Sequence, residues 1–317
     1  MSVPPPSSPF SLGHGAGPRR DVVGYGGKPP RVEWPGGARV AVSLVVNYEE
    51  GSEYSHAAGD ARNEGQGELD YRLDDRYRDL GVESTYEYGS RAGIWRMLSL
   101  FEEYGVKTTF FAAAAALELN PAVARALTLG GHEPCSHGWR WSEPWLFDSP
   151  DEEREHIRAA IESIRATTGE RPRGWYWRYS PSAWTRELLV EEGGFLYDSD
   201  AVNDDLPYFT EVRGKRHLVV PYTYTVNDGR IIAKGYMGLP EFADHVRRAV
   251  DELRREADRG TPKMMSIGLH PRWMGQPARA SVLREVLEEL IAPGDLWIAR
   301  RDEIAQWWID KSDGWAR

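Results

Sequence analysis

Acidic and basic side chains follow several apolar segments of this sequence, at the points where those segments end. Glu49 and Glu50 come after one such segment, His137 after a second, and His270 closes a third. The same kind of position is held by Arg178, Asp200 and Arg272. Carboxylates and imidazoles transfer protons in general acid–base catalysis, and guanidinium groups stabilise a developing oxyanion. If the fold brings these segment ends together, we expect an acid–base site.

Each of these residues also has an ordinary structural interpretation. Two adjacent glutamates are most often a solvated turn, and an arginine is often a salt-bridge partner. Their shared position at segment ends favours one site over several unrelated roles. Nucleophilic catalysis has little support, because Cys135 lies within an apolar segment and no G-x-S-x-G motif occurs. The zinc motifs H-E-x-x-H and C-x-x-C are also absent.

The apolar segments have the length and the β-branched and aromatic content of strands. The predicted strands are residues 39–47, 107–112, 131–136, 174–177, 195–198, 217–222, 263–270 and 295–299. Helical patterns lie at residues 90–104, 149–168, 239–260, 280–292 and 301–310. Such alternation predicts parallel strands joined by crossover helices, and about eight strands favour a closed or nearly closed α/β barrel over an open sheet. The active site of such a barrel lies at the C-terminal ends of its strands.

The composition indicates one globular domain with an N-terminal extension. Of the 317 residues, 41% are hydrophobic and 28% are charged, so the chain can build a core. Residues 1–30 are rich in Pro, Gly and Ser and predict an extended arm, which leaves residues 31–317 as a single barrel domain.

The charge argues against several classes of partner. A net charge of −10 does not suit a general nucleic-acid binder or an anionic membrane surface. No apolar run approaches the ~20 residues of a membrane span, and the N-terminus does not resemble a signal peptide. With one cysteine, no intrachain disulfide exists, and we expect a cytoplasmic enzyme with a small-molecule substrate.

The strand-end motifs resemble those of the polysaccharide deacetylase family, also called the NodB-like domain, over most of residues 30–310. The resemblance implies a distorted (β/α) barrel. The family's paired aspartates, a base and a metal ligand, match Glu49 and Glu50. Its metal-binding histidine pair matches His137 and Trp141. Its arginine motif matches Arg178 with Pro181, and its Leu-His motif, which carries the general acid, matches Leu269 and His270.

The departures from the family pattern point to one of its branches. Tryptophan at position 141 leaves only Glu50 and His137 as potential metal ligands, whereas zinc requires at least three protein ligands. The pattern is similar to the metal-independent bacterial allantoinases. The matching blocks are VVNYEEG, ESTYEYGSRAG, SHGWRW, NDDLPY, VPYTYTVNDGR and KMMSIGLH. This likeness implies that no cofactor is needed, with zinc or another divalent metal as the alternative, and it implies a homotetramer.

The expected reaction is hydrolysis of a non-peptide C–N bond, with ring opening of a cyclic ureide such as allantoin. Glu49 is the expected base, its pKa raised by burial, and His270 is the expected acid. Arg178 or the backbone around His137 would stabilise the oxyanion. The expected substrate-binding residues are Glu50, Glu83, Tyr86, Arg91, Trp139, Trp141, Asp200 and Arg272, with the 83–93 segment folding over the rim. The alternatives are a metal-dependent N-deacetylase of an acetylated amino sugar and a non-catalytic ligand-binding barrel.

Overall fold

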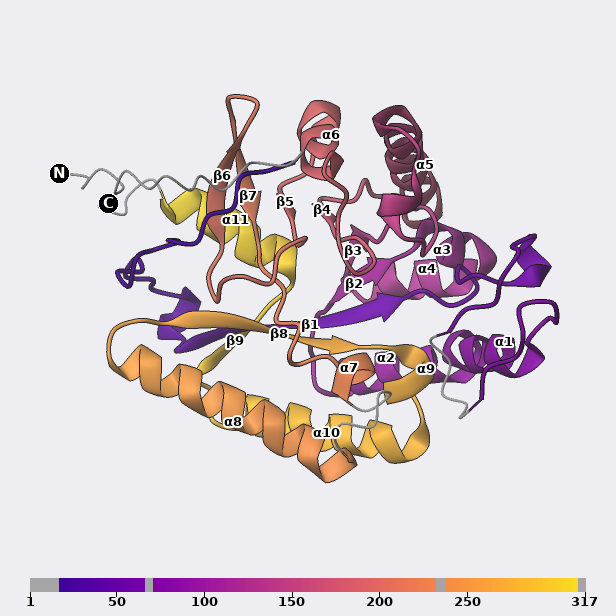
Figure 1. The fold of residues 1–317 in the computed structure, drawn as a ribbon. Helices are drawn as coiled ribbons and strands as arrows, with labels where there is room; N and C mark the ends of the chain where they lie inside the picture. Colours follow the sequence, from indigo (N-terminus) through magenta and orange to yellow (C-terminus); the bar gives the residue numbers. More distant parts are fainter. Residues whose placement is uncertain (1–16, 66–70, 232–237, 313–317) are drawn as a thin grey trace, which may run out of the picture.

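A curled, mostly parallel sheet forms the centre of the protein (Figure 1). The computed structural model describes residues 17–65, 71–231 and 238–312. Within them the strand order is β6-β7-β5-β4-β3-β2-β1-β8, and β9 also pairs with β1. The strands are β1 Val40–Tyr48, β2 Thr109–Ala112, β3 Glu133–Ser136, β4 Gly174–Trp175, β5 Tyr197–Asp198, β6 Tyr208–Val212, β7 Lys215–Val219, β8 Lys263–Leu269 and β9 Leu296–Ile298. Only β6 and β7 pair in the antiparallel sense.

All eight predicted strands overlap an observed strand, and the barrel prediction is confirmed. The sequence analysis missed β6, which forms a hairpin with β7 through Arg213 and Gly214 at positive φ. Its residues are mostly half-buried or exposed, because β6 is an edge strand. It therefore lacks the apolar run that marks the interior strands.

The barrel is closed by a loop rather than by a ladder of strands. The edge strands β6 and β8 are not paired with each other in the part of the chain that the structure describes. A segment after β7 runs along β8 instead, where Gly268 N donates to Val226 O at 2.8 Å. A Cβ atom at position 268 would lie 1.9 Å from the Tyr222 hydroxyl, so only glycine allows the closing segment to approach β8 this closely. The closing segment thereby comes to lie beside the C-terminal end of β8.

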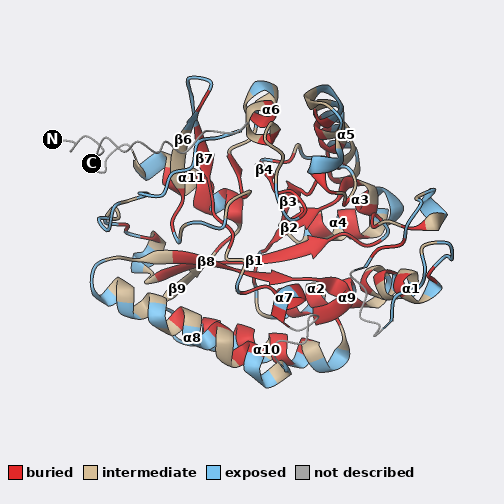
Figure 2. Ribbon diagram, in the orientation of Figure 1, coloured by how far each residue is buried: buried red, intermediate tan, exposed pale blue. Residues whose placement is uncertain are grey.

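Helices cover the outside of the sheet. Figure 1 shows α8 and α10 on one side, and α5 and α6 on the opposite side. Figure 2 shows most of the strands buried, while the outer faces of the helices are exposed. The α-helices are α1 Leu80–Tyr88, α2 Ile94–Glu103, α3 Ala114–Leu119, α4 Pro121–Leu129, α5 Pro150–Thr168, α6 Thr185–Glu192, α7 Asp228–Ile231, α8 Leu239–Asp258, α9 Pro271–Met274, α10 Pro277–Ile291 and α11 Arg301–Ser312. The shorter turns are η1 Pro35–Gly37, η2 His56–Ala58, η3 Gly89–Gly93 and η4 Pro144–Leu146.

The N-terminal extension is only partly within the described residues. The part of the predicted arm at residues 1–16 lies outside them, and residues 17–34 contain no helix or strand. Tyr25 ties this stretch to the body of the protein, because its hydroxyl donates to Pro207 O at 2.5 Å. Among the described residues, no helix combines the length and the apolar character that crossing a membrane requires.

Candidate active site

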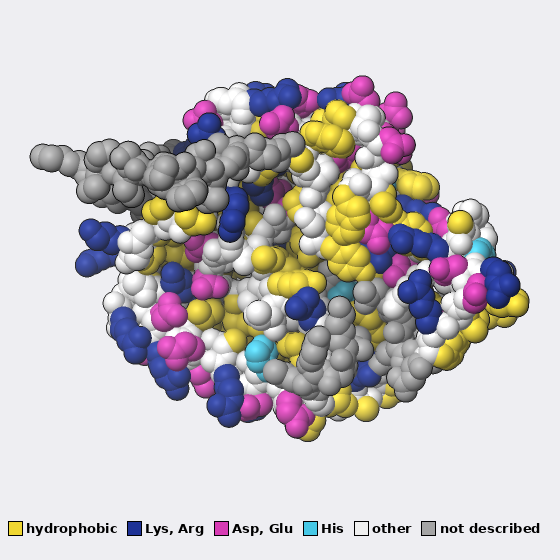
Figure 3. All heavy atoms as spheres, viewed as in Figure 1, with side chains coloured by type: hydrophobic (Ala, Val, Ile, Leu, Met, Phe, Trp, Pro, Cys, Tyr) yellow, Lys and Arg dark blue, Asp and Glu magenta, His cyan; other side chains and the backbone are white. Residues whose placement is uncertain are grey.

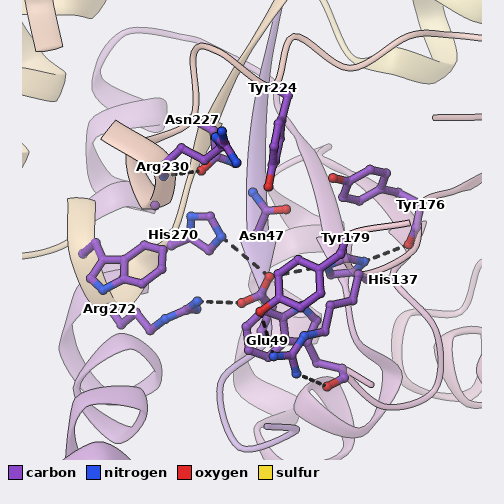
Figure 4. Close-up of a pocket in the computed structure, with 14 residues that line it drawn as sticks. Asn47, Glu49, His137, Tyr176, Tyr179, Tyr224, Asn227, Arg230, His270 and Arg272 are labelled. Carbon is purple, nitrogen blue, oxygen red and sulfur yellow. Dashed lines mark hydrogen bonds and ion pairs between the residues drawn. The ribbon is translucent and has the colours of Figure 1, made fainter. Parts of the chain in front are cut away.

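A pocket with about 510 Å³ of open space lies at the C-terminal ends of β1, β3, β4 and β8. It is lined by Asn47, Glu49, His137, Trp141, Tyr176, Arg178, Tyr179, Tyr224, Asn227, Gly229, Arg230, His270, Arg272 and Trp273. Figure 4 shows Glu49 in the middle, with His137, His270 and Arg272 turned toward it. The fold therefore brings together six of the predicted site residues, namely Glu49, His137, Trp141, Arg178, His270 and Arg272.

Glu49 is the centre of the polar contacts in this pocket, and it is 2% exposed. Its Oε1 lies 3.3 Å from His137 Nε2 and 3.6 Å from His270 Nε2. Its Oε2 lies 2.8 Å from Arg272 Nη2. Burial raises the pKa of Glu49, but Arg272, His270 and His137 outweigh that effect and hold the pKa well below its usual range. The expected rise toward neutrality is therefore wrong, and Glu49 is ionised at neutral pH.

Glu50 lies behind this pocket rather than in its wall. Its Oε2 accepts a hydrogen bond from Glu49 N at 2.9 Å, and its Oε1 accepts one from Arg272 N at 3.3 Å. Burial raises the pKa of Glu50 to about 7, and the neighbouring Glu49 adds to this rise while Arg272 opposes it. Glu50 was expected to bind substrate, but its carboxyl group supports the backbone of the site instead.

His270 is held by Asp228, which the sequence analysis did not single out. Asp228 Oδ1 accepts from His270 Nδ1 at 2.6 Å, and Oδ2 accepts from His270 N at 2.8 Å. Although burial opposes it, the charges of Asp228 and Glu49 raise the pKa of His270. Since Nδ1 is occupied, Nε2 is the atom that can exchange a proton in the pocket. The block VPYTYTVNDGR contained Asp228, but no strand-end signal marked it.

His137 is oriented by the backbone of the next strand. A carbonyl can only accept, so the 2.8 Å contact with Tyr176 O fixes the proton on Nδ1 and turns Nε2 toward Glu49. The Tyr176 ring stacks on the imidazole with 5.2 Å between ring centres. Tyr176 is another pocket residue that the sequence analysis missed, and it restricts rotation of His137.

Arg178 lines the pocket, but its charge is already paired. Both of its terminal nitrogens contact the Glu64 carboxylate, at 2.8 and 2.9 Å. Its guanidinium carbon lies 3.6 Å from the centre of a Trp141 ring, and Nη1 donates to Trp141 O at 2.9 Å. Arg178 therefore fixes Trp141 as an apolar wall, which makes it a weak candidate for oxyanion stabilisation.

Arg272 has the more suitable position for that role. It is fully buried, with Nη1 3.7 Å from Glu50 Oε1, while Nη2 contacts Glu49. The buried Tyr86 ring lies below the guanidinium, at 4.5 Å from its central carbon. None of its three side-chain nitrogens makes a well-directed hydrogen bond within the described structure, so its contacts with Glu49 and Glu50 leave hydrogen-bonding capacity unused. Tyr86 thus acts through Arg272 and does not line the pocket.

Besides Glu50 and Tyr86, four more predicted binding residues do not line this pocket. The Trp139 indole turns outward and donates to Glu118 at 3.3 Å. Asp200 accepts from Trp177 N at 2.7 Å. On the 83–93 segment, Glu83 pairs with Arg78 at 2.7 Å, and the exposed Arg91 lies 3.8 Å from Glu87. That segment packs behind the pocket, as α1 and η3 against α9, and does not cover its rim.

The residues present do not suit the metal that polysaccharide deacetylases typically bind. The predicted ligand pair, Glu50 and His137, is not brought together, because His137 faces Glu49 and Glu50 lies behind it. The Arg272 guanidinium stands between the two glutamates, where a metal would bring its charge. No group of three or more potential ligands occurs among the residues that the structure describes. A bound metal would require this arginine to leave both carboxylates.

Two exposed aromatic side chains, Tyr179 in the pocket wall and Trp145 beside it, lie against each other. Trp145 stacks on Tyr179 with 6.2 Å between ring centres, and Tyr179 has an unusual positive φ of 61°. Figure 3 shows hydrophobic side chains gathered near the middle of this face of the molecule. Strained backbone at a pocket rim is frequently functional, and here it turns an aromatic ring toward the opening.

Comparisons with known proteins agree with this geometry. The family profile described as polysaccharide deacetylase matches residues 76–194. A Schizosaccharomyces pombe protein classed among the polysaccharide deacetylases is 37% identical over 313 residues, which is 92% of this chain and 97% of that protein. The crystal structure of a probable polysaccharide deacetylase from Pseudomonas aeruginosa PAO1 is similar, with 43% identity, a TM-score of 0.86 and coverage of 91% and 97% of the two chains. The crystal structure of PuuE allantoinase is also 43% identical, with a TM-score of 0.85 and coverage of 91% and 96%.

Proposed function

The chain belongs to the polysaccharide deacetylase family, and from this premise we propose that it hydrolyses a non-peptide C–N bond in a small cyclic ureide such as allantoin. One observation carries the proposal: Glu49 and His270 face each other in one pocket with 3.6 Å between Oε1 and Nε2, where the pKa of Glu49 is held low and the pKa of His270 is raised. A pair whose pKa values are pushed apart in this way divides the roles of base and acid. The similarity to an allantoinase supports the choice of substrate class.

In the proposed reaction, Glu49 takes a proton from water as the water oxygen attacks the ring carbonyl. His270 Nε2 gives its proton to the ring nitrogen as the C–N bond breaks. Arg272 stabilises the negative charge that develops on the carbonyl oxygen. Trp141, held by Arg178, supplies a flat apolar wall for the ring.

The contact between Glu49 and His270 also provides a route by which both groups return to their starting protonation states. After ring opening, Glu49 holds a proton and His270 has lost one. The two groups are 3.6 Å apart, so a small movement allows the proton to return to His270. Asp228 favours this return because it stabilises the imidazolium form. The product carboxyl group then ionises as it leaves.

A turnover screen tests the proposal. The purified protein is incubated with allantoin, hydantoin, a cyclic imide and N-acetylglucosamine oligomers, each with and without a chelator. We expect ring opening of a cyclic ureide that persists in the chelator, and less than one bound metal per chain by elemental analysis. Release of acetate from the oligomers, with loss of activity in the chelator, would instead identify a metal-dependent N-deacetylase. A catalytically inactive barrel would turn over none of these substrates.

A further inference from the structure

The pocket contains a cation that has no carboxylate partner among the residues that the structure describes. Each of the other cationic groups in the wall has a carboxylate partner: Arg178 has Glu64, Arg272 has Glu49, and His270 has Asp228. Arg230 also lines the pocket, but none of the ion pairs found among the described residues includes it. Its guanidinium carbon instead lies 4.3 Å from the centre of the Tyr224 ring.

The position of Arg230 relative to the reacting groups is fixed by the short helix α7. Asp228, two residues before Arg230, is buried and makes both hydrogen bonds to His270. Gly229 lies so close to Trp273 that an added Cβ would be 2.2 Å from its ring. The Arg230 backbone N–H donates to Asn227 O at 3.1 Å, which completes the turn. Figure 4 shows Arg230 and Asn227 on one side of the pocket, away from Glu49.

From this arrangement we infer that Arg230 binds an anionic substituent of the substrate. The inference rests on the proposed function and, within its substrate class, predicts a preference for cyclic ureides that carry a carboxylate outside the ring over neutral ones such as allantoin. A guanidinium presents donors in a fork that matches a carboxylate. The Tyr224 face supports the guanidinium without neutralising it. The ring would lie against Trp141 with its reacting amide at Glu49 and His270, and the carboxylate would extend to Arg230.

Two ligands of the same shape and different charge test the inference. Hydantoin-5-acetic acid carries a carboxylate where hydantoin-5-acetamide carries a neutral amide. The measurements are kcat/KM for both compounds and, independently of turnover, their Kd values by calorimetry. We expect the wild-type protein to prefer the acid by about 10- to 100-fold, the effect of one charge-assisted pair. This preference should weaken with added salt, because Arg230 is exposed.

Three variants separate recognition from a structural role. Arg230→Gln should lose the preference for the acid through changes in KM and Kd for the acid, while KM and Kd for the amide stay the same. Arg230→Lys should recover part of the preference for the acid. Arg255→Gln, on the exposed face of α8, is the matched control and should behave as the wild type. Equal binding of both compounds by the wild type, or an equal loss for both in Arg230→Gln, would overturn the inference. If neither compound is hydrolysed, the proposed reaction fails for them, but the Kd values still decide the role of Arg230.

Discussion

Glu49 and Glu50 are neighbours in the sequence, but their surroundings give them opposite protonation behaviour. Glu49 faces two imidazoles and a guanidinium, which hold its pKa well below the usual range despite burial. Glu50 faces the backbone and the negative charge of Glu49, and burial raises its pKa to about 7. A carboxylate that accepts a proton from water must be ionised beforehand, so the low pKa favours Glu49 over Glu50 as the proposed base.

Substitution of each glutamate by glutamine tests this assignment. Glu49→Gln keeps the shape and removes the base, so kcat should fall by about 10²–10⁴ while substrate still binds. Glu50→Gln keeps an oxygen for Glu49 N and should cost less than about tenfold, since Glu50 is already half protonated near neutral pH. Steady-state kinetics check both. An inactive Glu50→Gln together with an active Glu49→Gln would show that Glu50, and not Glu49, is the base.

The pH dependence should follow His270. Since the pKa of His270 is raised above its usual 6.5, its acid form persists to a higher pH than in an unperturbed histidine and is lost as the pH rises through that raised value. Asp228→Asn removes a charge that stabilises the imidazolium, so the basic limb of the kcat/KM profile should move to lower pH. Asp148→Asn, an exposed residue outside the pocket, is the control. An unmoved limb in Asp228→Asn would exclude His270 as the acid.

At the level of elements, the sequence could predict which chain segments meet. Glu49, His137 and His270 come together because β1, β3 and β8 run parallel and end at one edge of the sheet. Side-chain directions beyond the last paired residue were not predictable, because strict alternation ends with the strand. Trp139 and Asp200 lie two to three residues past their strands and turn away from the pocket.

Two of the residues that the sequence analysis missed, Asp228 and Arg230, lie outside the predicted elements. Asp228 and Arg230 belong to a four-residue helix that follows an irregular segment. Neither hydrophobic periodicity nor a strand end could place them, and their position depends on long-range contacts with β8 and Trp273. The 83–93 segment was expected over the rim because it is polar. It packs against α9 instead, since Tyr86, Gly89 and Gly93 are buried.

Close packing of η3 against α9 should be essential for the site. An added Cβ at Gly93 would lie 2.1 Å from Pro271 O, in the residue that follows His270. Gly93→Ala should therefore displace α9, lower stability by roughly 1–3 kcal/mol and reduce kcat. Gly65→Ala is the control, because nothing lies within 4 Å of its Cβ position. Denaturant unfolding and kinetics measure both effects; unchanged values for Gly93→Ala would show that α9 tolerates the shift.

For the whole molecule, buried ionisable groups determine how stability varies with pH. Burial raises the pKa of Glu50 and of Glu53 to about 7 and also raises that of Glu133. A carboxyl group whose pKa is higher in the folded protein than in the unfolded chain gives its full stabilisation at a pH below the unfolded pKa. This stabilisation is lost as the pH rises through the folded pKa. The stability contribution of His270 also falls as the pH rises, because its pKa is raised in the folded protein.

Two buried histidines act in the opposite sense, but only at lower pH. Burial lowers the pKa values of His132 and His156 to about 4, so the unfolded chain binds more protons than the folded chain between pH 4 and 6.5. In the unfolded chain these histidines are half protonated at pH 6.5 and about nine-tenths neutral by pH 7.5, so their opposing slope fades across this range. Between pH 6.5 and 8, the carboxyl groups and His270 therefore decide the trend.

We accordingly expect Tm to fall as the pH rises from 6.5 to 8. A loss of 1 kcal/mol corresponds to roughly 2–4 °C in domains of about 150–250 residues, so the shift is within reach of calorimetry. Glu53→Gln should make the slope shallower, because glutamine can still accept from Gly51 N but cannot ionise. Glu252→Gln, on the surface of α8, should leave the slope unchanged. A Tm that rises over this range would mean that the buried carboxyl groups are ionised throughout it. In that case the low pKa of Glu49 could no longer distinguish it from Glu50.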